Sequence, residues 1–143
     1  MPYDVLLVDD DADYRRLMAE ILEATGLPCR LHQVATGAGA LDFLNRRGAF
    51  AQAPHVDLVY LDIDLPERSG QQVLSAIKGD PALCGIPVVM LTGLDDDQQK
   101  LLAARHGANS YVLKPSDPPA MMDLLGRTHH YWLCVHQHAR RAA

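Results

Sequence analysis

The stretch Asp57-Leu58-Val59-Tyr60-Leu61-Asp62-Ile63-Asp64-Leu65-Pro66-Glu67-Arg68-Ser69-Gly70 contains the clearest structural signal in this chain. Residues 58–61 are apolar without alternation, which is typical of a strand buried on both faces of a parallel sheet. The run stops at Asp62, and Asp64 follows two residues later. Because open α/β sheets bind ligands at the carboxyl ends of their strands, Asp62 is the candidate chemical centre. The alternative is that Asp62 only ends the strand, since aspartate is common in turns.

Size and composition narrow the class of protein. The 143 residues suit one domain, and we expect a single domain over residues 1–143. A net charge of −5 argues against a nucleic-acid partner, whose binding face is basic. We expect no membrane association, because no apolar run approaches the roughly 20 residues that span a bilayer. The start of the chain lacks a secretory signal and its three cysteines lack metal-ligand spacing, so we expect a cytoplasmic protein.

Apolar runs alternate with helical patterns along the whole chain. The runs that predict strands are residues 5–8, 29–35, 58–61, 86–91 and 110–113. Helices are expected between them, and the last one extends over about residues 118–138. This alternation predicts an α/β, doubly wound (βα)5 fold of the flavodoxin-like type, with helices on both faces of a parallel sheet. The expected strand order is 2-1-3-4-5.

Acidic residues stand where the first and third predicted strands end. Asp9, Asp10 and Asp11 follow the first strand, and Asp62 follows the third. In the order 2-1-3-4-5 these two strands are neighbours, so Asp9, Asp10 and Asp62 should converge. Two unit charges ~5 Å apart at an effective dielectric of ~20 repel by about 3 kcal/mol, so a cation is needed. An all-oxygen site with few protein ligands suits Mg²⁺.

Two further polar residues end the fourth and fifth predicted strands. Thr92 would supply a hydroxyl donor and Lys114 a point charge. Together with a nucleophilic carboxylate and a divalent metal, they form a site able to accept a phosphoryl group. Simpler interpretations remain open. The aspartates after the first strand could cap the next helix, as Asp11 is expected to do. Thr92 could merely end a strand, and Lys114 could be a solvated lysine.

Four motifs resemble a known family. They are Leu7-Val8-Asp9-Asp10-Asp11, Leu61-Asp62-Ile63-Asp64-Leu65-Pro66 with Gly70, Val89-Met90-Leu91-Thr92-Gly93 and Tyr111-Val112-Leu113-Lys114-Pro115. Over about residues 4–127, the chain resembles the receiver domain of two-component response regulators. The resemblance implies that a histidine kinase, or a phosphohistidine intermediate, phosphorylates Asp62. It also implies that the chain is not an enzyme: its only activities would be phosphotransfer to itself and its own dephosphorylation.

The resemblance further implies a role for each site residue. Its Mg²⁺ ligands would be Asp10, Asp62 and the backbone carbonyl of Asp64, with Asp9 acting mainly through water. Thr92 and Lys114 would hold the phosphoryl oxygens, and Tyr111 would be the aromatic switch residue that swings inward when Thr92 moves. The face made by the fourth helix, fifth strand and fifth helix would then change and control dimerisation or partner binding.

A narrower likeness is to the single-domain regulators paired with phytochromes in bacteria. It rests on the loop 46–54, the run 80–89 and the tail residues 131–135. It suggests a phytochrome-type histidine kinase as partner and a homodimer, although related stand-alone regulators serve other kinases.

The predicted last helix carries two apolar stripes. One contains Met122, Leu125, His129, Trp132 and His136, and the other contains Leu124, Tyr131 and Val135. One stripe should pack on the sheet, which leaves the second as a dimer interface. The alternative is a packed helix with scattered exposed residues. The histidines at 129, 130, 136 and 138 lack i, i+4 pairing, so we do not expect a metal there.

Two other classes of function compete with the phosphorylated switch. The first is a phosphorylation-independent docking module on the same scaffold. The presence of all the acidic residues, Thr92 and Lys114 argues against it, because such a module need not keep the metal site. The second is a phosphatase-type hydrolase with Asp62 as nucleophile and Asp64 two residues later. It would need a lid or substrate domain, for which 143 residues leave no room.

Overall fold

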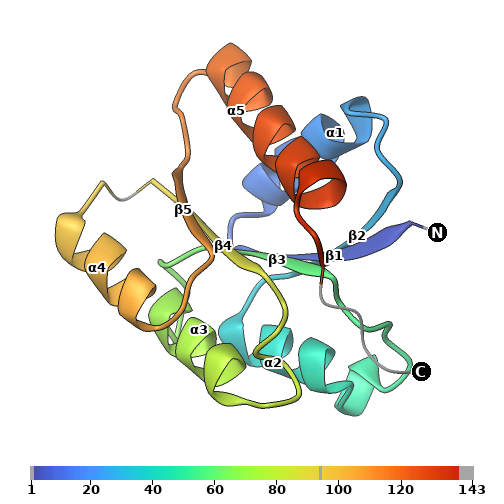
Figure 1. Ribbon diagram of the computed structural model, residues 1–143, viewed down its shortest axis with the longest axis vertical. Helices are drawn as coiled ribbons and strands as arrows, with labels where there is room; N and C mark the ends of the chain where they lie inside the picture. Colours follow the sequence, from blue (N-terminus) through green and yellow to red (C-terminus); the bar gives the residue numbers. More distant parts are fainter. Residues whose placement is uncertain (1, 94, 139–143) are drawn as a thin grey trace.

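The computed structural model describes residues 2–93 and 95–138. Five of its segments pair as parallel strands of one sheet. The strands are β1 (Tyr3–Val8), β2 (Cys29–Val34), β3 (Leu58–Leu61), β4 (Val88–Thr92) and β5 (Ser110–Leu113). Their order, β2-β1-β3-β4-β5, confirms the predicted doubly wound, flavodoxin-like α/β fold (Figure 1). β4 starts two residues later than the apolar run, at Val88, because Pro87 has no N–H to donate to the sheet.

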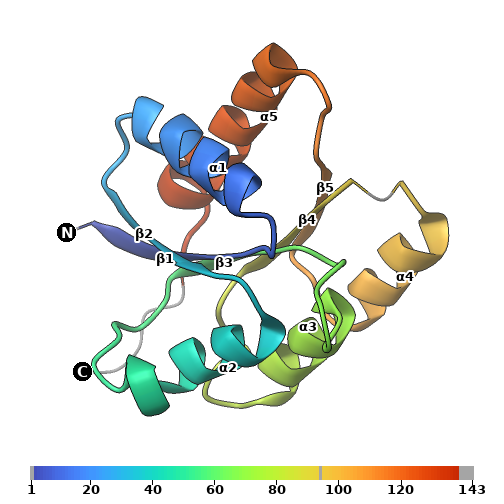
Figure 2. The same ribbon diagram turned by 180° about the vertical axis from the view of Figure 1, so that it is seen from behind.

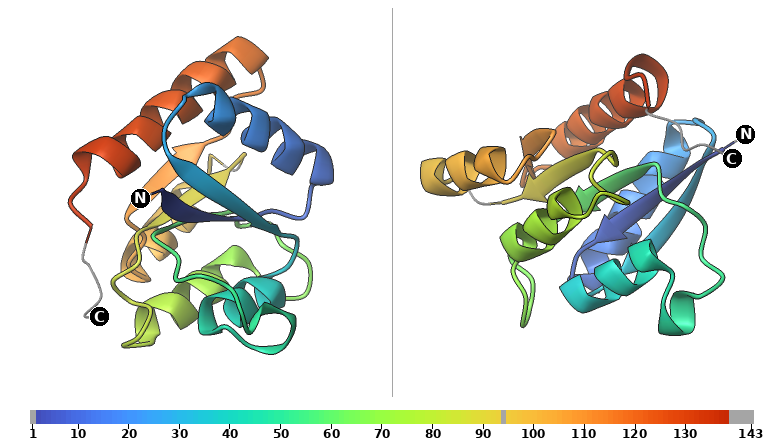
Figure 3. Two further views of the ribbon diagram at one scale, coloured as in Figure 1. Left: turned by 90° about the vertical axis from the view of Figure 1, so that its right-hand side faces the viewer. Right: turned by 60° about the horizontal axis from the view of Figure 1, so that its bottom comes forward.

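Helices cover both faces of the sheet (Figures 1 and 2). They are α1 (Ala12–Ala24), α2 (Gly37–Asn45), α3 (Gly70–Gly79), α4 (Asp97–Arg105) and α5 (Pro118–His130), with a short 3-10 turn at Gly48–Phe50. α1 and α5 pack on one face, and α2, α3 and α4 pack on the other, so the sheet is the middle of three layers (Figure 3). Each of these helices is too short or too polar to cross a lipid bilayer, within the residues described.

β3 is buried on both faces, as its lack of alternation predicts. Leu58 and Tyr60 point to the α1 and α5 side, whereas Val59 and Leu61 point to the other side. All four side chains are fully buried, and burying each such apolar side chain contributes about 1.5–3 kcal/mol. The core therefore fixes the position and direction of the segment that leads into Asp62.

Polar residues start the helices. The N-cap side chains that accept backbone N–H bonds belong to Asp11, Thr36, Ser69, Asp96 and Asp117. Ser69 also forms a reciprocal capping box with Gln72, which stabilises the start of α3 directly after the Asp62 loop. A cap of this kind contributes about 1 kcal/mol to helix stability.

The C-terminal helix is shorter than the expected 118–138. α5 continues as a π-helical turn, Tyr131–Val135, and helical backbone stops there because His136 is extended (φ −64°, ψ 138°). The chain then folds back, and the ring of His138 lies 5.0 Å from that of Tyr3 at the start of β1. Contact with the start of β1 therefore takes the place of the last expected helical turn.

One apolar stripe of this helix packs on the sheet. Leu125, His129 and Trp132 are buried, as expected, but Met122 is 53% exposed and Met121 is buried in its place. The buried stripe follows the i, i+4 row from Met121 through Leu125 and His129, so the expectation for Met122 was wrong by one position.

Candidate functional site

Three carboxylates lie together at the carboxyl ends of β1 and β3. One oxygen from each of Asp9, Asp10 and Asp62 lies within 4.8 Å of the others. The register explains this, because Val8 pairs with Leu61 and the N–H of Asp62 donates to the Val8 carbonyl at 3.0 Å. Asp9 and Asp62 are 1% and 7% exposed, while Asp10 faces solvent.

The loop after Asp62 folds tightly against the strand end. The Gly70 N–H donates to the Ile63 carbonyl at 2.8 Å. A Cβ at Gly70 would lie 2.1 Å from the Asp62 carbonyl oxygen and 2.6 Å from the Ile63 Cα, so only glycine fits. Gly70 is also the first residue of α3, and the start of that helix therefore closes the loop beside the acidic cluster.

Lys114 reaches the cluster from β5. Its Nζ donates to Asp9 Oδ2 at 2.6 Å and lies 3.6 Å from Asp62 Oδ2. Its backbone N–H donates to the Thr92 carbonyl at 2.8 Å, which ties the end of β5 to the end of β4. The structure thus joins Lys114 to Asp9 across more than one hundred positions of sequence.

The cluster carries more negative charge than Lys114 offsets. Burial above all, together with the charge of Asp9, raises the pKa of Asp62 to about 6, against the opposing effect of Lys114 and of backbone hydrogen bonds from Asp64 and Ile63. A raised pKa means that the groups around the carboxylate do not fully offset the cost of its burial. Closely spaced carboxylate oxygens are the ligands that Mg²⁺ or Mn²⁺ prefers, so the donor set fits a divalent cation.

The other predicted site residues lie around this cluster. Thr92 is buried at the end of β4, beside Leu113 in the sheet register. Tyr111 is half-buried on β5 and packs against the α2, α3 and α4 side of the core. The Asp64 side chain is exposed and lies outside the group of three carboxylates. No histidine or cysteine of the described chain joins a group of metal-ligating residues.

Two residues of α1 also reach the site. The Arg15 guanidinium donates to the Asp9 carbonyl at 2.6 Å. The ring of Tyr14 lies against Lys114, with Nζ 4.0 Å from its centroid. Nothing in the sequence indicated directly that Tyr14 belongs to the site. Its position three residues after Asp11 was the available signal.

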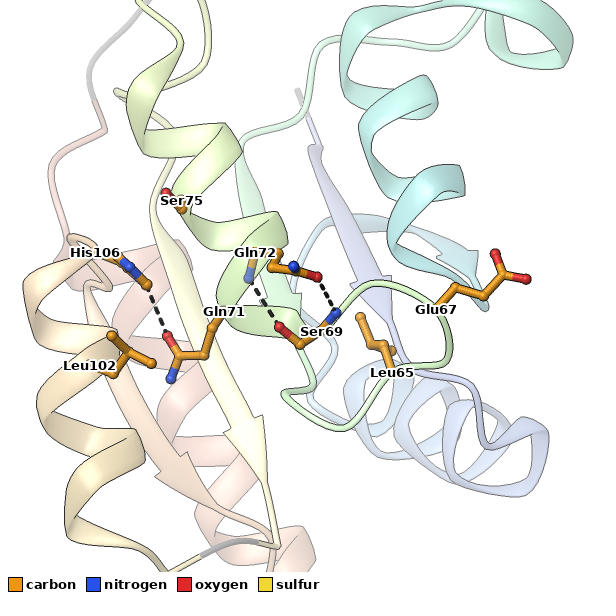
Figure 4. Close-up of a pocket in the computed structure, with 8 residues that line it drawn as sticks. All are labelled: Leu65, Glu67, Ser69, Gln71, Gln72, Ser75, Leu102 and His106. Carbon is orange, nitrogen blue, oxygen red and sulfur yellow. Dashed lines mark hydrogen bonds between the residues drawn. The ribbon is translucent and has the colours of Figure 1, made fainter.

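A shallow groove of about 670 Å³ lies between α3 and α4 (Figure 4). The amide of Gln71 lies buried in it and is already paired. Its Nε2 donates to the Gln99 carbonyl at 2.9 Å, and its Oε1 lies 3.2 Å from His106 Nδ1. The Gln71 amide therefore links α3 to α4.

Comparison with known proteins identifies the family. Residues 5–126 match the model of the response regulator receiver domain. The chain is 30% identical over 132 residues to response regulator Rcp1 of Synechocystis sp., a match that covers 92% of this chain and 90% of Rcp1. It is 33% identical over 133 residues to the probable methanogenesis regulatory protein FilR2 of Methanothrix harundinacea, covering 92% of this chain and 84% of FilR2.

Solved structures agree with the sequence relatives. The Mn²⁺-bound form of Rcp1 superposes with a TM-score of 0.92 at 28% identity, covering 97% of this chain and 100% of Rcp1. The phosphorylated cyanobacterial phytochrome response regulator RcpA gives a TM-score of 0.93 at 28% identity, covering 98% of this chain and 100% of RcpA. The bacteriophytochrome response regulator AtBRR gives 0.79 at 29% identity, covering 99% of each chain. This chain therefore belongs to the response regulator receiver domain family, with phytochrome response regulators among its relatives.

Proposed function

We propose that this protein is a single-domain response regulator in the cytoplasm that accepts a phosphoryl group on Asp62 from a histidine kinase. The observation that carries the proposal is the convergence of Asp9, Asp10 and Asp62 with the ammonium group of Lys114. Asp62 is largely buried, and the cluster opens to solvent at Asp10. A phosphohistidine side chain of a partner would approach from that open side.

Each residue has a separate role in this reaction. Asp10, Asp62 and the Asp64 backbone carbonyl would hold Mg²⁺, with Asp9 contributing mainly through water. When bound, the ion neutralises charge on the carboxylates and on the phosphoryl oxygens. A carboxylate oxygen of Asp62 forms the new bond to phosphorus while the bond from phosphorus to the donor imidazole nitrogen breaks. The nitrogen keeps that electron pair.

Phosphorylation would then change the surface around β5. It adds about −1.5 to −2 charge at Asp62, beside Lys114 and the buried end of β4. Thr92 and Lys114 would hold the new oxygens, and Tyr111 would move inward as Thr92 shifts. The α4-β5-α5 face would carry this change to a partner or to a second copy of the chain.

The partners we propose are a phytochrome-type histidine kinase and a second copy of this chain. Support for the kinase comes from the relatives, since RcpA and AtBRR are named as phytochrome and bacteriophytochrome response regulators. Support for a homodimer through the α4-β5-α5 face and the C-terminal helix comes from exposed apolar side chains on α4, α5 and the π-helical turn. They are Leu101, Met122, Tyr131 and Val135.

Labelling with a small-molecule phosphodonor tests the proposal. With acetyl phosphate and Mg²⁺, the wild-type protein should gain one acid-stable, base-labile phosphoryl group. Chelation of Mg²⁺ or the substitution Asp62→Asn should abolish the label. The matched control is Asp13→Asn, a nearby carboxylate that is exposed and outside the cluster.

Two results would contradict the proposal. Undiminished labelling of Asp62→Asn would show that another residue is the nucleophile. A folded wild-type protein that neither binds Mg²⁺ nor takes up the label would instead favour a phosphorylation-independent docking module.

A further inference from the structure

Capping and packing position Tyr14 at the start of α1. The Asp11 side chain caps this helix and accepts hydrogen bonds from the backbone N–H groups of Asp13 at 3.0 Å and Tyr14 at 3.2 Å. The Tyr14 side chain also packs against the core cluster between the sheet and α1 and α5. The ring therefore has one defined position beside the acidic cluster.

The Lys114 ammonium group lies between that ring and the carboxylates. Its Nζ is 4.0 Å from the Tyr14 ring centroid and 2.6 Å from Asp9 Oδ2. An ammonium group over the face of a tyrosine ring is attracted by the electrons of the ring. Lysine otherwise has a long, flexible side chain whose charged end samples many positions. Contact on two sides restricts Nζ to a place 3.6 Å from Asp62 Oδ2.

The hydroxyl group of Tyr14 does not take part in the contact between the ring and Lys114. Its oxygen is buried and, among the residues that the structure describes, lacks a hydrogen-bond partner. Burial raises the pKa of this hydroxyl, and the charges of Asp9 and Asp62 raise it further, so it stays protonated. The face of the ring can therefore be tested independently of the hydroxyl by substitution with phenylalanine.

We propose that Tyr14 is a positioning residue whose ring holds Lys114 in place for phosphorylation of Asp62. This inference rests on the proposed function for its effect on rate, but the placement of Lys114 can be measured without phosphorylation. The ring places Lys114 before the phosphoryl group arrives, so the side chain loses little freedom during transfer. Replacing the ring by an aliphatic side chain should slow phosphorylation while leaving the carboxylates unchanged.

A double-mutant cycle tests the effect on rate. We expect Tyr14→Leu to lower the rate of labelling by acetyl phosphate about fivefold, the scale of a partly exposed cation–π contact. Tyr14→Phe should restore nearly the wild-type rate, because it keeps the ring. In a Lys114→Ala background, Tyr14→Leu should lower the rate by less than about twofold, because the residue it acts through is gone.

Nuclear magnetic resonance tests the placement directly. Protons of the Lys114 ε-methylene should show an upfield ring-current shift in the wild type and in Tyr14→Phe, and lose it in Tyr14→Leu. If Tyr14→Leu does not fold, the shift in the wild type and Tyr14→Phe still decides whether the ring covers Lys114.

Three outcomes would overturn the inference. They are a wild-type rate in Tyr14→Leu, an equal loss in the Lys114→Ala background, or no ring-current shift in the wild type. Failure of the wild type to take up any label would instead overturn the proposed function, and the ring-current shift would still test the placement of Lys114.

Discussion

His129 on α5 is a titratable residue inside the core. It is fully buried, and its Nδ1 lies 2.9 Å from the hydroxyl oxygen of Tyr60 on β3. Its Nε2 is also buried and has no hydrogen-bond partner within residues 2–93 and 95–138. Burial lowers the pKa of His129 from 6.5 to about 4. The packing of α5 on the sheet therefore requires a neutral imidazole.

This residue should make stability depend on pH. Below pH 6.5 the unfolded chain binds a proton at His129 that the folded chain does not bind, until the pH approaches about 4. This group alone should lower the free energy of unfolding as pH falls through that interval, by up to about 3 kcal/mol. Asp62 acts in the opposite direction over a similar interval, so the measurement is a comparison of wild type with His129→Leu. In urea denaturation at pH 7 and pH 4.5, the change in stability should be less favourable to the folded state in wild type than in His129→Leu. An equal change in the two proteins would show that His129 does not contribute.

The charge of Asp62 should cost the metal-free protein stability. Its pKa is raised from 3.8 to about 6, so ionisation disfavours the folded state as pH rises through that interval. At pH 7 the penalty is about 3 kcal/mol, and Asp62→Asn should remove most of it. Urea denaturation with a chelator should therefore show Asp62→Asn as more stable than wild type. Asp13→Asn, an exposed carboxylate, should have little effect, and a destabilised Asp62→Asn would contradict the interpretation.

At the scale of elements, helix starts follow local rules while helix pairs depend on distant residues. Asp11, Thr36 and Ser69 each cap the helix that the sequence places after them. The link between α3 and α4 is different in kind. Gln71 and Gln99 lie on separate helices, and only folding brings their side chains together.

Removing this link should loosen α4. Gln71→Ala leaves the Gln99 carbonyl and His106 Nδ1 without the amide that bonds them, which should cost about 1–2 kcal/mol. Hydrogen exchange measured by mass spectrometry should then show faster exchange in α4 than in wild type. Gln98→Ala, an exposed glutamine on the same helix, should leave exchange unchanged. Equal exchange in α4 of Gln71→Ala and wild type would mean that core packing alone holds the helix.

At the scale of the whole molecule, the apolar stripe that the sheet does not cover is the surface that we propose for a second copy. Tyr131 and Val135 are 47% and 52% exposed, although the neighbouring Trp132 and Leu133 are buried. Large exposed apolar side chains of this kind mark partner surfaces when they gather on one face. The π-helical turn over these residues sets which of them point outward.

A charge on this surface should weaken the proposed homodimer. We expect Val135→Asp to raise the dimer dissociation constant about tenfold or more, because a carboxylate would be desolvated at the interface. Sedimentation equilibrium with and without acetyl phosphate measures the constant. Glu20→Gln, on the exposed side of α1, is the control and should not change it. A monomer in every condition, or a dimer unaffected by Val135→Asp, would count against the proposed interface.

The sequence alone determined the fold class and the positions of the acidic residues at the strand ends. These follow from short-range patterns, since each strand, cap and turn is specified by residues within a few positions of one another. The strand order was predicted from the orders that doubly wound sheets adopt, and the structure confirmed it. Only the tertiary structure decided that Tyr14 covers Lys114, that Gln71 bonds Gln99, that Met121 replaces Met122 in the core and that the last helix ends at Val135. Each of these depends on side chains that lie far apart in sequence and meet only when the layers pack, so no local pattern specifies them.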